Sequence, residues 1–144
     1  MPLKNILQGV AGNLSEQSVG QMQAEYGAYL MSGETISSGF KLIRDVVLFT
    51  DRRIILFDRQ GTTGQKMRVE SIYLSTIVHV TAETVGFGID DSELTVTYLT
   101  TPFLATHSPS FASRKFEFPK KFNIQQLYVW LEEIAFGNHA RINE

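Results

Sequence analysis

Residues 49–61 read FTDRRIILFDRQG, an apolar run with a cluster of aspartate and arginine at each end. The segments 46–49 and 54–57 are apolar at every position. A strand with one face in water alternates apolar and polar residues, so this pattern predicts two strands of a sheet that is covered on both faces. Aspartate side chains hydrogen-bond turn backbones, and the tight turn between the strands is therefore expected at Thr50, Asp51 and Arg52.

The charged clusters could form a site or only the corners of the sheet. Three residues are the candidates for contact with a partner: Arg52, Arg53 and Arg59. Three nearby aspartates offer them exposed ion pairs worth at most about 1 kcal/mol each: Asp45, Asp51 and Asp58. The charges thus fit the turns of a sheet, and no catalytic residue is expected among them.

The strand pattern continues along the chain on both sides of this stretch. From Gly33 onward, short runs rich in Val, Ile, Thr, Phe and Tyr are divided by Gly, Asp, Pro and Ser. This spacing predicts about seven strands in an up-and-down antiparallel sheet. The expected turns lie at residues 44–45, 50–52, 61–64 and 87–92.

Helical patterns flank the strands. Residues 3–31 carry a helical signal in two pieces, the second over 16–31 behind Ser15 as the N-cap. A C-terminal helix has an apolar stripe from Ile124 to Ala135, and Gly137-Asn138 is its expected stop. The result is an α+β, mainly β fold divided into an N-terminal helical segment (1–32), a β-rich domain (33–137) and a C-terminal tail (138–144).

An antiparallel sheet of about seven strands followed by one amphipathic helix is the plan of a pleckstrin-homology (PH) domain, as it is of other small barrels. In that fold the helix plugs the open end of a bent, partly open barrel. Three segments carry a more specific likeness: GETISSGFKLIRDVVLFTDRRIILFDRQGTTGQK, SIYLSTI and AETVGFGIDDSEL. Together they resemble the bacterial PH-like family once known as a domain of unknown function, from about residue 30 to the C-terminal helix.

The resemblance implies a PH-like fold, self-assembly into ring-like homo-oligomers and no established enzymatic activity. This chain departs from the family pattern at two places. The usual SIPY is SIYL here, and ETAG is ETVG. Neither difference affects the expected fold.

Composition narrows the function further. A chain of 144 residues fits one domain, and a net charge of -2 lacks the basic field of proteins that bind nucleic acid non-specifically. The absence of cysteine excludes thiol chemistry and disulfides. No apolar stretch approaches the roughly 20 residues of a membrane-spanning helix, and the N-terminus does not resemble a signal peptide. A cytoplasmic protein is expected.

Other motifs fit structural roles better than chemical ones. GTTGQK (61–66) joins two strands, unlike a phosphate-binding loop, and DDSE (90–93) lacks the length of a calcium loop. No two of the three histidines have metal-ligand spacing, so neither a metal nor a cofactor is expected: His79, His107 and His139. Residues 99–113 suggest a flexible loop that could also contact a partner.

Basic and aromatic residues near 114–121 suggest a solvated strand edge more than a nucleic-acid surface: Arg114, Lys115, Lys120 and Lys121. The connection IRDV at 43–46 leaves no room for the long basic loop with which eukaryotic PH domains bind phosphoinositides.

The preferred function is a non-catalytic interaction module that forms a homo-oligomer and could also hold other proteins. Its doubly apolar strands must be covered by the N-terminal helices or by a second subunit. The alternative is a module that binds lipid or a membrane surface through Arg52 and Arg53. An enzyme is the least supported of the three, since no nucleophile and base are paired.

Overall fold

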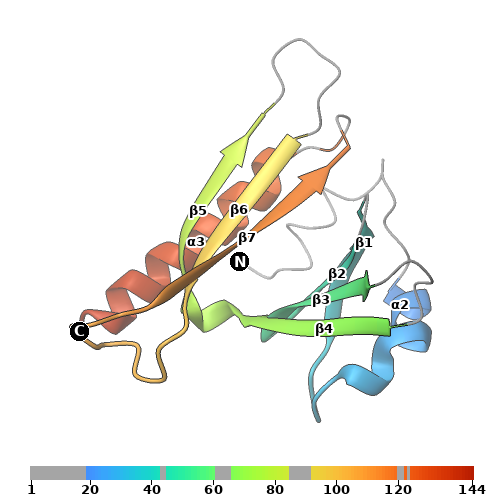
Figure 1. Cartoon of the computed structure of the whole chain (residues 1–144), viewed down its shortest axis with the longest axis horizontal. Helices are drawn as coiled ribbons and strands as arrows, with labels where there is room; N and C mark the ends of the chain where they lie inside the picture. Colours follow the sequence, from blue (N-terminus) through green and yellow to red (C-terminus); the bar gives the residue numbers. More distant parts are fainter. Residues whose placement is uncertain (1–18, 43–44, 61–65, 85–91, 120–121, 123) are drawn as a thin grey trace.

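The computed structural model describes residues 19–42, 45–60, 66–84, 92–119, 122 and 124–144. In this part of the chain, seven antiparallel strands form two sheets, with one helix before them and one after (Figure 1). The first sheet contains β1 (Ile36–Lys41), β2 (Asp45–Thr50), β3 (Arg53–Gln60) and β4 (Lys66–Tyr73). The second contains β5 (Ile77–Glu83), β6 (Ser92–Leu99) and β7 (Phe111–Phe118). The helices are α2 (Val19–Tyr26) and α3 (Ile124–Ile142), and the 3-10 turns are η1 (Gly27–Tyr29) and η2 (Leu74–Thr76).

Each sheet is a meander in which strands pair in chain order, so the predicted up-and-down plan is confirmed. The turn between β2 and β3 is also where it was expected. Thr50 Oγ1 accepts hydrogen bonds from the backbone N–H groups of Arg52 and Arg53 at 3.1 and 3.0 Å. The two sheets meet at η2, and no strand pairing within the described residues joins them. The barrel is therefore not closed.

The main core lies between the two sheets and α3. Its largest side chains are aromatic and meet edge to face or stacked: Phe40, Phe49, Phe118, Phe122 and Trp130. Phe118 and Phe122 stack with ring centroids 4.5 Å apart. Aromatic side chains of this size bury more apolar area than any others, so they account for much of the stability of a small domain.

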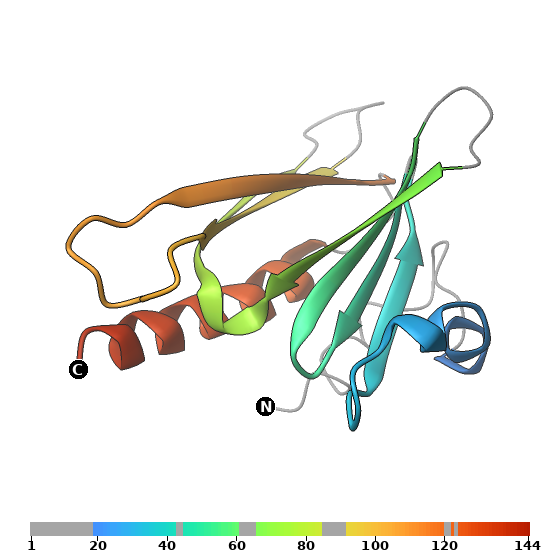
Figure 2. The same cartoon turned by 60° about the horizontal axis from the view of Figure 1, so that its bottom comes forward.

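The helix α2 lies beside the first sheet, on its outer face (Figure 2). A second apolar cluster fills the space between them. Leu48, Ile55 and Phe57 point to this side, whereas their neighbours in β2 and β3 point into the main core. The prediction that both faces are covered is confirmed, and the cover is the chain's own α2 with Met22 fully buried beneath it. A Cβ atom at Gly39 would lie 2.5 Å from the Met22 terminal methyl, so the glycine makes room for α2.

The N-terminal helix was expected over 16–31. The described part begins at Val19, and the helix gives way to η1 at Gly27. The aromatic rings of Tyr26 and Tyr29 pack on Phe57 with centroids 4.4 and 5.2 Å away. Burial raises the pKa of Tyr26 above its usual value. The first helical piece predicted from sequence, near residues 3–14, lies outside the described residues.

The predicted stop of the C-terminal helix at Gly137 is wrong, because α3 continues to Ile142. Asn138 is buried, and its Nδ2 donates hydrogen bonds of 2.8 Å to the carbonyl oxygens of Leu74 and Ile77. Arg141 Nη2 donates to the Ser75 carbonyl at 2.9 Å. These bonds to η2 and β5 hold the last turns of the helix in place. Residues 138–142, assigned to a tail from the sequence, thus belong to α3.

Candidate functional site

The charged turn at the start of β3 is the first candidate for a site. Arg53 pairs with Glu34, which lies 19 residues earlier, rather than with an aspartate of the turn. Its Nη2 and Nε atoms lie 2.8 Å from the two carboxylate oxygens, a bidentate arrangement. The side chain of Glu34 is 0% exposed and that of Arg53 is 11% exposed. The expected pairing of Arg53 with the turn aspartates is therefore wrong.

Further hydrogen bonds complete the Glu34–Arg53 network. Thr50 Oγ1 and the backbone N–H of Met31 donate to the carboxylate at 2.7 and 2.9 Å. Arg53 also donates to Ser71 Oγ and to the Tyr29 carbonyl, both at 2.7 Å. The Arg53 guanidinium, with these backbone and Thr50 donors, lowers the pKa of Glu34 to about 2. The same carboxylate raises the pKa of Arg53.

This network ties the segment after α2 to β2, β3 and β4. It is a structural link, because the guanidinium donates to internal groups from each of its nitrogen atoms. Of the three arginines singled out from the sequence, Arg52 and Arg59 lie at exposed positions. The fold thus does not present the three side chains as one basic surface.

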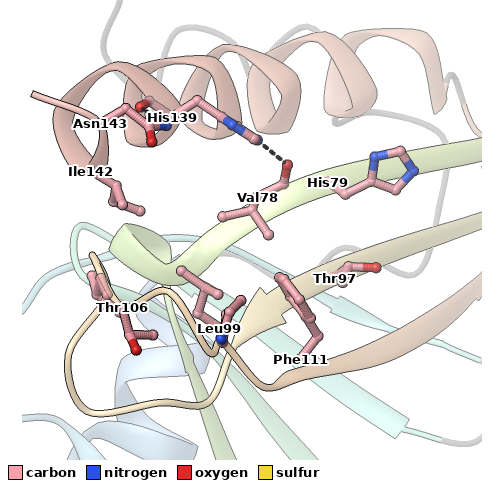
Figure 3. A pocket seen from close by; sticks show the side chains of 11 residues that line it. Val78, His79, Thr97, Leu99, Thr106, Phe111, His139, Ile142 and Asn143 are labelled. Carbon is pink, nitrogen blue, oxygen red and sulfur yellow. Dashed lines mark hydrogen bonds between the residues drawn. The ribbon is translucent and has the colours of Figure 1, made fainter.

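A second candidate is a pocket of about 480 Å³ beside the C-terminal end of α3, which we call the histidine pocket (Figure 3). Two histidines from distant parts of the chain line it, His79 on β5 and His139 on α3. Apolar groups dominate the rest of its wall. The remaining lining residues are Val78, Thr97, Leu99, Leu104, Thr106, Pro109, Phe111, Ile142 and Asn143.

The mostly apolar lining of this pocket suits an apolar group. His139 Nε2 lies 2.7 Å from the Val78 carbonyl oxygen, which can only accept, so Nε2 carries a hydrogen (Figure 3). None of the described residues that line it is a lysine, an arginine, an aspartate or a glutamate. Within the residues that the structure describes, no three His, Cys, Asp or Glu side chains gather as metal ligands do. Pockets of this volume suit a small molecule or one large side chain.

The other residues considered from the sequence do not gather at either place. Glu93 pairs with Lys115 at 3.3 Å and Arg114 pairs with Glu70 at 3.0 Å. His107 is exposed on the β6–β7 loop and does not line the histidine pocket. Three segments with predicted motifs fall outside the described residues: 61–65, 85–91 and 120–121. Among the described helices, none is both long and apolar enough to cross a membrane.

Sequence comparison agrees with this architecture. The model of the bacterial PH domain family matches residues 5–135, most of the chain. The chain belongs to the bacterial PH domain family. An uncharacterized protein of Bacillus subtilis (strain 168), YjqA, is 41% identical over 90 residues, which cover 62% of this chain and 72% of YjqA.

Solved structures share the fold of this bacterial PH domain. A DUF1696 family protein with a pleckstrin-homology domain from Shewanella loihica PV-4 has a TM-score of 0.64 at 26% identity, covering 87% of this chain and 99% of that one. A pleckstrin homology domain from Shewanella amazonensis SB2B has a TM-score of 0.62 at 30% identity, covering 90% and 97%. The predicted PH-like fold is confirmed.

The outer side of α3 gives this bacterial PH domain a third candidate surface. Phe136 is 78% exposed and Val129 is 52% exposed, and both border a shallow hollow of about 370 Å³. Tyr128, Glu132 and Glu133 complete the surface, which we call the α3 face. The Tyr128 hydroxyl donates to Glu132 Oε2 at 2.7 Å, and this bond raises the pKa of Tyr128.

Sequence reasoning missed the α3 face and the histidine pocket for different reasons. Val129 and Phe136 are seven residues apart and lie off the buried stripe of the helix, so a second stripe could have been read from the sequence. No spacing rule joins His79 to His139. Only the packing of α3 along β5 brings them together.

Proposed function

We propose that this bacterial PH domain is a non-catalytic interaction module that associates with further copies of itself through the α3 face. The proposal places it in the cytoplasm, where a chain without cysteine loses nothing to a reducing environment. The resemblance of residues 33–66 to ring-forming bacterial PH-like proteins supports self-association.

One observation carries the proposal: Phe136 is 78% exposed on a well-packed helix. Phe136 and the half-exposed Val129 border the same hollow, so they form an apolar patch, and such patches often mark sites of protein contact. Burying a side chain of this size against a partner contributes about 1.5–3 kcal/mol. The outer face of the first sheet gives no such driving force, because α2 already covers it.

The position of a second exposed aromatic residue favours a ring. Phe103 is 82% exposed on the β6–β7 loop, which is a different element from α3. If the loop of one copy meets the α3 face of the next, the contact joins two different surfaces. Contacts between two different surfaces generate a closed ring when the rotations that relate successive copies add up to a full turn.

Size-exclusion chromatography with light scattering tests the proposal at micromolar concentration. We expect the wild-type protein to have a mass several times that of one 16.2 kDa chain, and Phe136→Asp to have a mass close to that of a single chain. Val69→Asp is the matched control, since Val69 is an exposed apolar residue of β4, away from α3. A wild-type monomer, or equal loss of mass in both variants, would falsify self-association through this face.

The alternative of a lipid-binding module has weaker support. Its basic cluster depended on Arg52 and Arg53, and the Arg53 guanidinium is bound within the domain. Arg52 alone gives little attraction to an anionic surface, where each basic residue contributes about 1 kcal/mol.

A further inference from the structure

The edge of β5 that faces α3 is bonded to the helix at one end and open at the other. β5 pairs with β6 on its other side, and α3 packs along it in the opposite chain direction (Figure 1). At the start of β5, side chains of Asn138 and His139 bond the carbonyls of Ile77 and Val78. These bonds close the gap between helix and strand at that end.

Further along, strand and helix leave an open groove of about 660 Å³, which we call the β5 groove. Val80 and Ile124 are buried at its base, while His79 and Thr81 are exposed along the strand. Val129 stands on the helix side and is half-exposed. Phe136, the centre of the α3 face, does not line the groove.

The backbone of an edge strand determines what can fill such a groove. Along β5, N–H and C=O groups recur at the strand period, and no described strand pairs with them on the α3 side. Only another extended backbone can bond such a row in register. Extended chains rise about 3.3 Å per residue, so about six residues match the segment from His79 to Thr84.

The charges around the groove add a second requirement. Glu83 is exposed at the end of β5, between the lining residues Ala82 and Thr84. At the other end, Glu132 and Glu133 follow Val129 along α3. Among the residues that the structure describes, no lysine or arginine lines the groove. A peptide with a basic residue near each end would therefore complement it.

We propose that the β5 groove binds an extended peptide segment of a partner protein, which adds to β5 as a further strand. The segment carries an apolar side chain in its middle and a lysine or arginine near each end. The middle side chain packs against Val129 and Val80. The basic ends reach past the groove, to Glu83 at one end and to Glu132 and Glu133 at the other. This site goes beyond self-association, because its occupant is a peptide of another protein. It shares Tyr128 and Val129 with the α3 face, so the variants that test it are also compared in a Phe136→Asp background.

A capped peptide with lysine at each end and alternating valine and threonine between them is the probe. We expect hydrogen–deuterium exchange of the full chain to slow at residues 79–84 when the peptide is added. Val129→Lys should weaken binding by about tenfold or more, since it fills the groove and repels the peptide ends. Val69→Lys, the same change on β4, should leave binding unchanged.

The same measurements in the Phe136→Asp background separate the two proposals. Peptide binding should persist there even if the protein becomes monomeric. A peptide of the same length with glutamate at each end should bind about fivefold more weakly than the lysine peptide at low salt. Protection at β1, β4 or β7 instead of β5, equal loss in the two valine variants, or equal binding of both peptides would overturn the proposal.

Discussion

The pair of Glu34 and Arg53 illustrates how a single buried contact can depend on residues that look unrelated in the sequence. Gly33 has a φ of +79° and completes a turn in which the Glu34 N–H bonds the Met31 carbonyl at 3.0 Å. The positive φ favours glycine, as at the third position of a type II turn. The turn brings the carboxylate under Arg53, where four donors surround it.

The low pKa of Glu34 predicts acid sensitivity. Its folded pKa of about 2 lies below the ordinary value of 4.5, so the ionised carboxylate stabilises the fold above pH 4.5. This stabilisation is lost as pH falls toward 2, and it amounts to about 3 kcal/mol. Urea unfolding followed by circular dichroism at a series of pH values should show this loss of unfolding free energy in the wild type. In Glu34→Gln the unfolding free energy should fall less between pH 4.5 and pH 2.

At neutral pH, Glu34→Gln should itself destabilise the fold by about 3–5 kcal/mol, because it leaves the Arg53 charge buried without a counter-ion. Glu133→Gln is the matched control, since that carboxylate is exposed on α3. If the two variants unfold at the same urea concentration, the buried pair does not stabilise the domain.

At the scale of elements, α3 shows how tertiary contacts override a local stop signal. Gly137 and Asn138 together look like a helix end, yet the side chains of Asn138, His139 and Arg141 bond four carbonyls of η2 and β5. The bond from Asn138 to the Ile77 carbonyl is buried. A buried carbonyl without a donor costs about 1–3 kcal/mol, so this bond outweighs the preference of glycine to end a helix. α3 is therefore longer than its sequence alone indicates.

Gly137→Ala should stabilise the domain by about 0.5–1 kcal/mol. The glycine lies inside the helix, and an added Cβ would meet nothing within 4 Å. Thermal unfolding measures the change, with Gly33→Ala as the contrasting variant, since its positive φ makes alanine unfavourable. Destabilisation by Gly137→Ala would mean that the helix ends where the sequence suggested.

The contact between α2 and β1 depends on a missing side chain. Gly39→Val should destabilise the domain by about 1–3 kcal/mol, because the new methyl groups would overlap Met22 and Leu48. Fluorescence of a hydrophobic dye should rise as α2 lifts from the sheet. Gly20→Val, where nothing lies within 4 Å, should leave the dye signal unchanged; an unaltered Gly39→Val would show that α2 is not held at this point.

For the whole molecule, both faces of the first sheet are covered within one chain, so the sheet can fold without a partner subunit. Because α2 covers the outer face within one chain, exposing that face by Gly39→Val should promote non-specific aggregation. Loss of Phe136 should instead reduce ordered assembly. A sequence with continuously apolar strands therefore does not by itself require a second subunit.

The sequence predicted the strands, their meander and the buried stripe of α3, since each depends on local periodicity. It could not predict which charged residue Arg53 meets, because Glu34 is 19 residues away and nothing local marks it as a partner. The end of α3 and the gathering of His79 with His139 depend on the same long-range packing. Long-range contacts of this kind leave no periodic trace in one sequence.

The enclosed Glu34 carboxylate also constrains how relatives can diverge. Replacing Glu34 or Arg53 alone leaves the other charge buried without a counter-ion. A tolerated change therefore has to alter both residues together or pass through a less stable single variant. Thr50 follows Glu34 by 16 residues and Arg53 follows Thr50 by 3, so the network corresponds to a sequence motif with fixed spacing. We therefore expect relatives that keep this network to carry a Gly-Glu pair followed at these intervals by Thr and Arg, because the pattern follows from a physical contact.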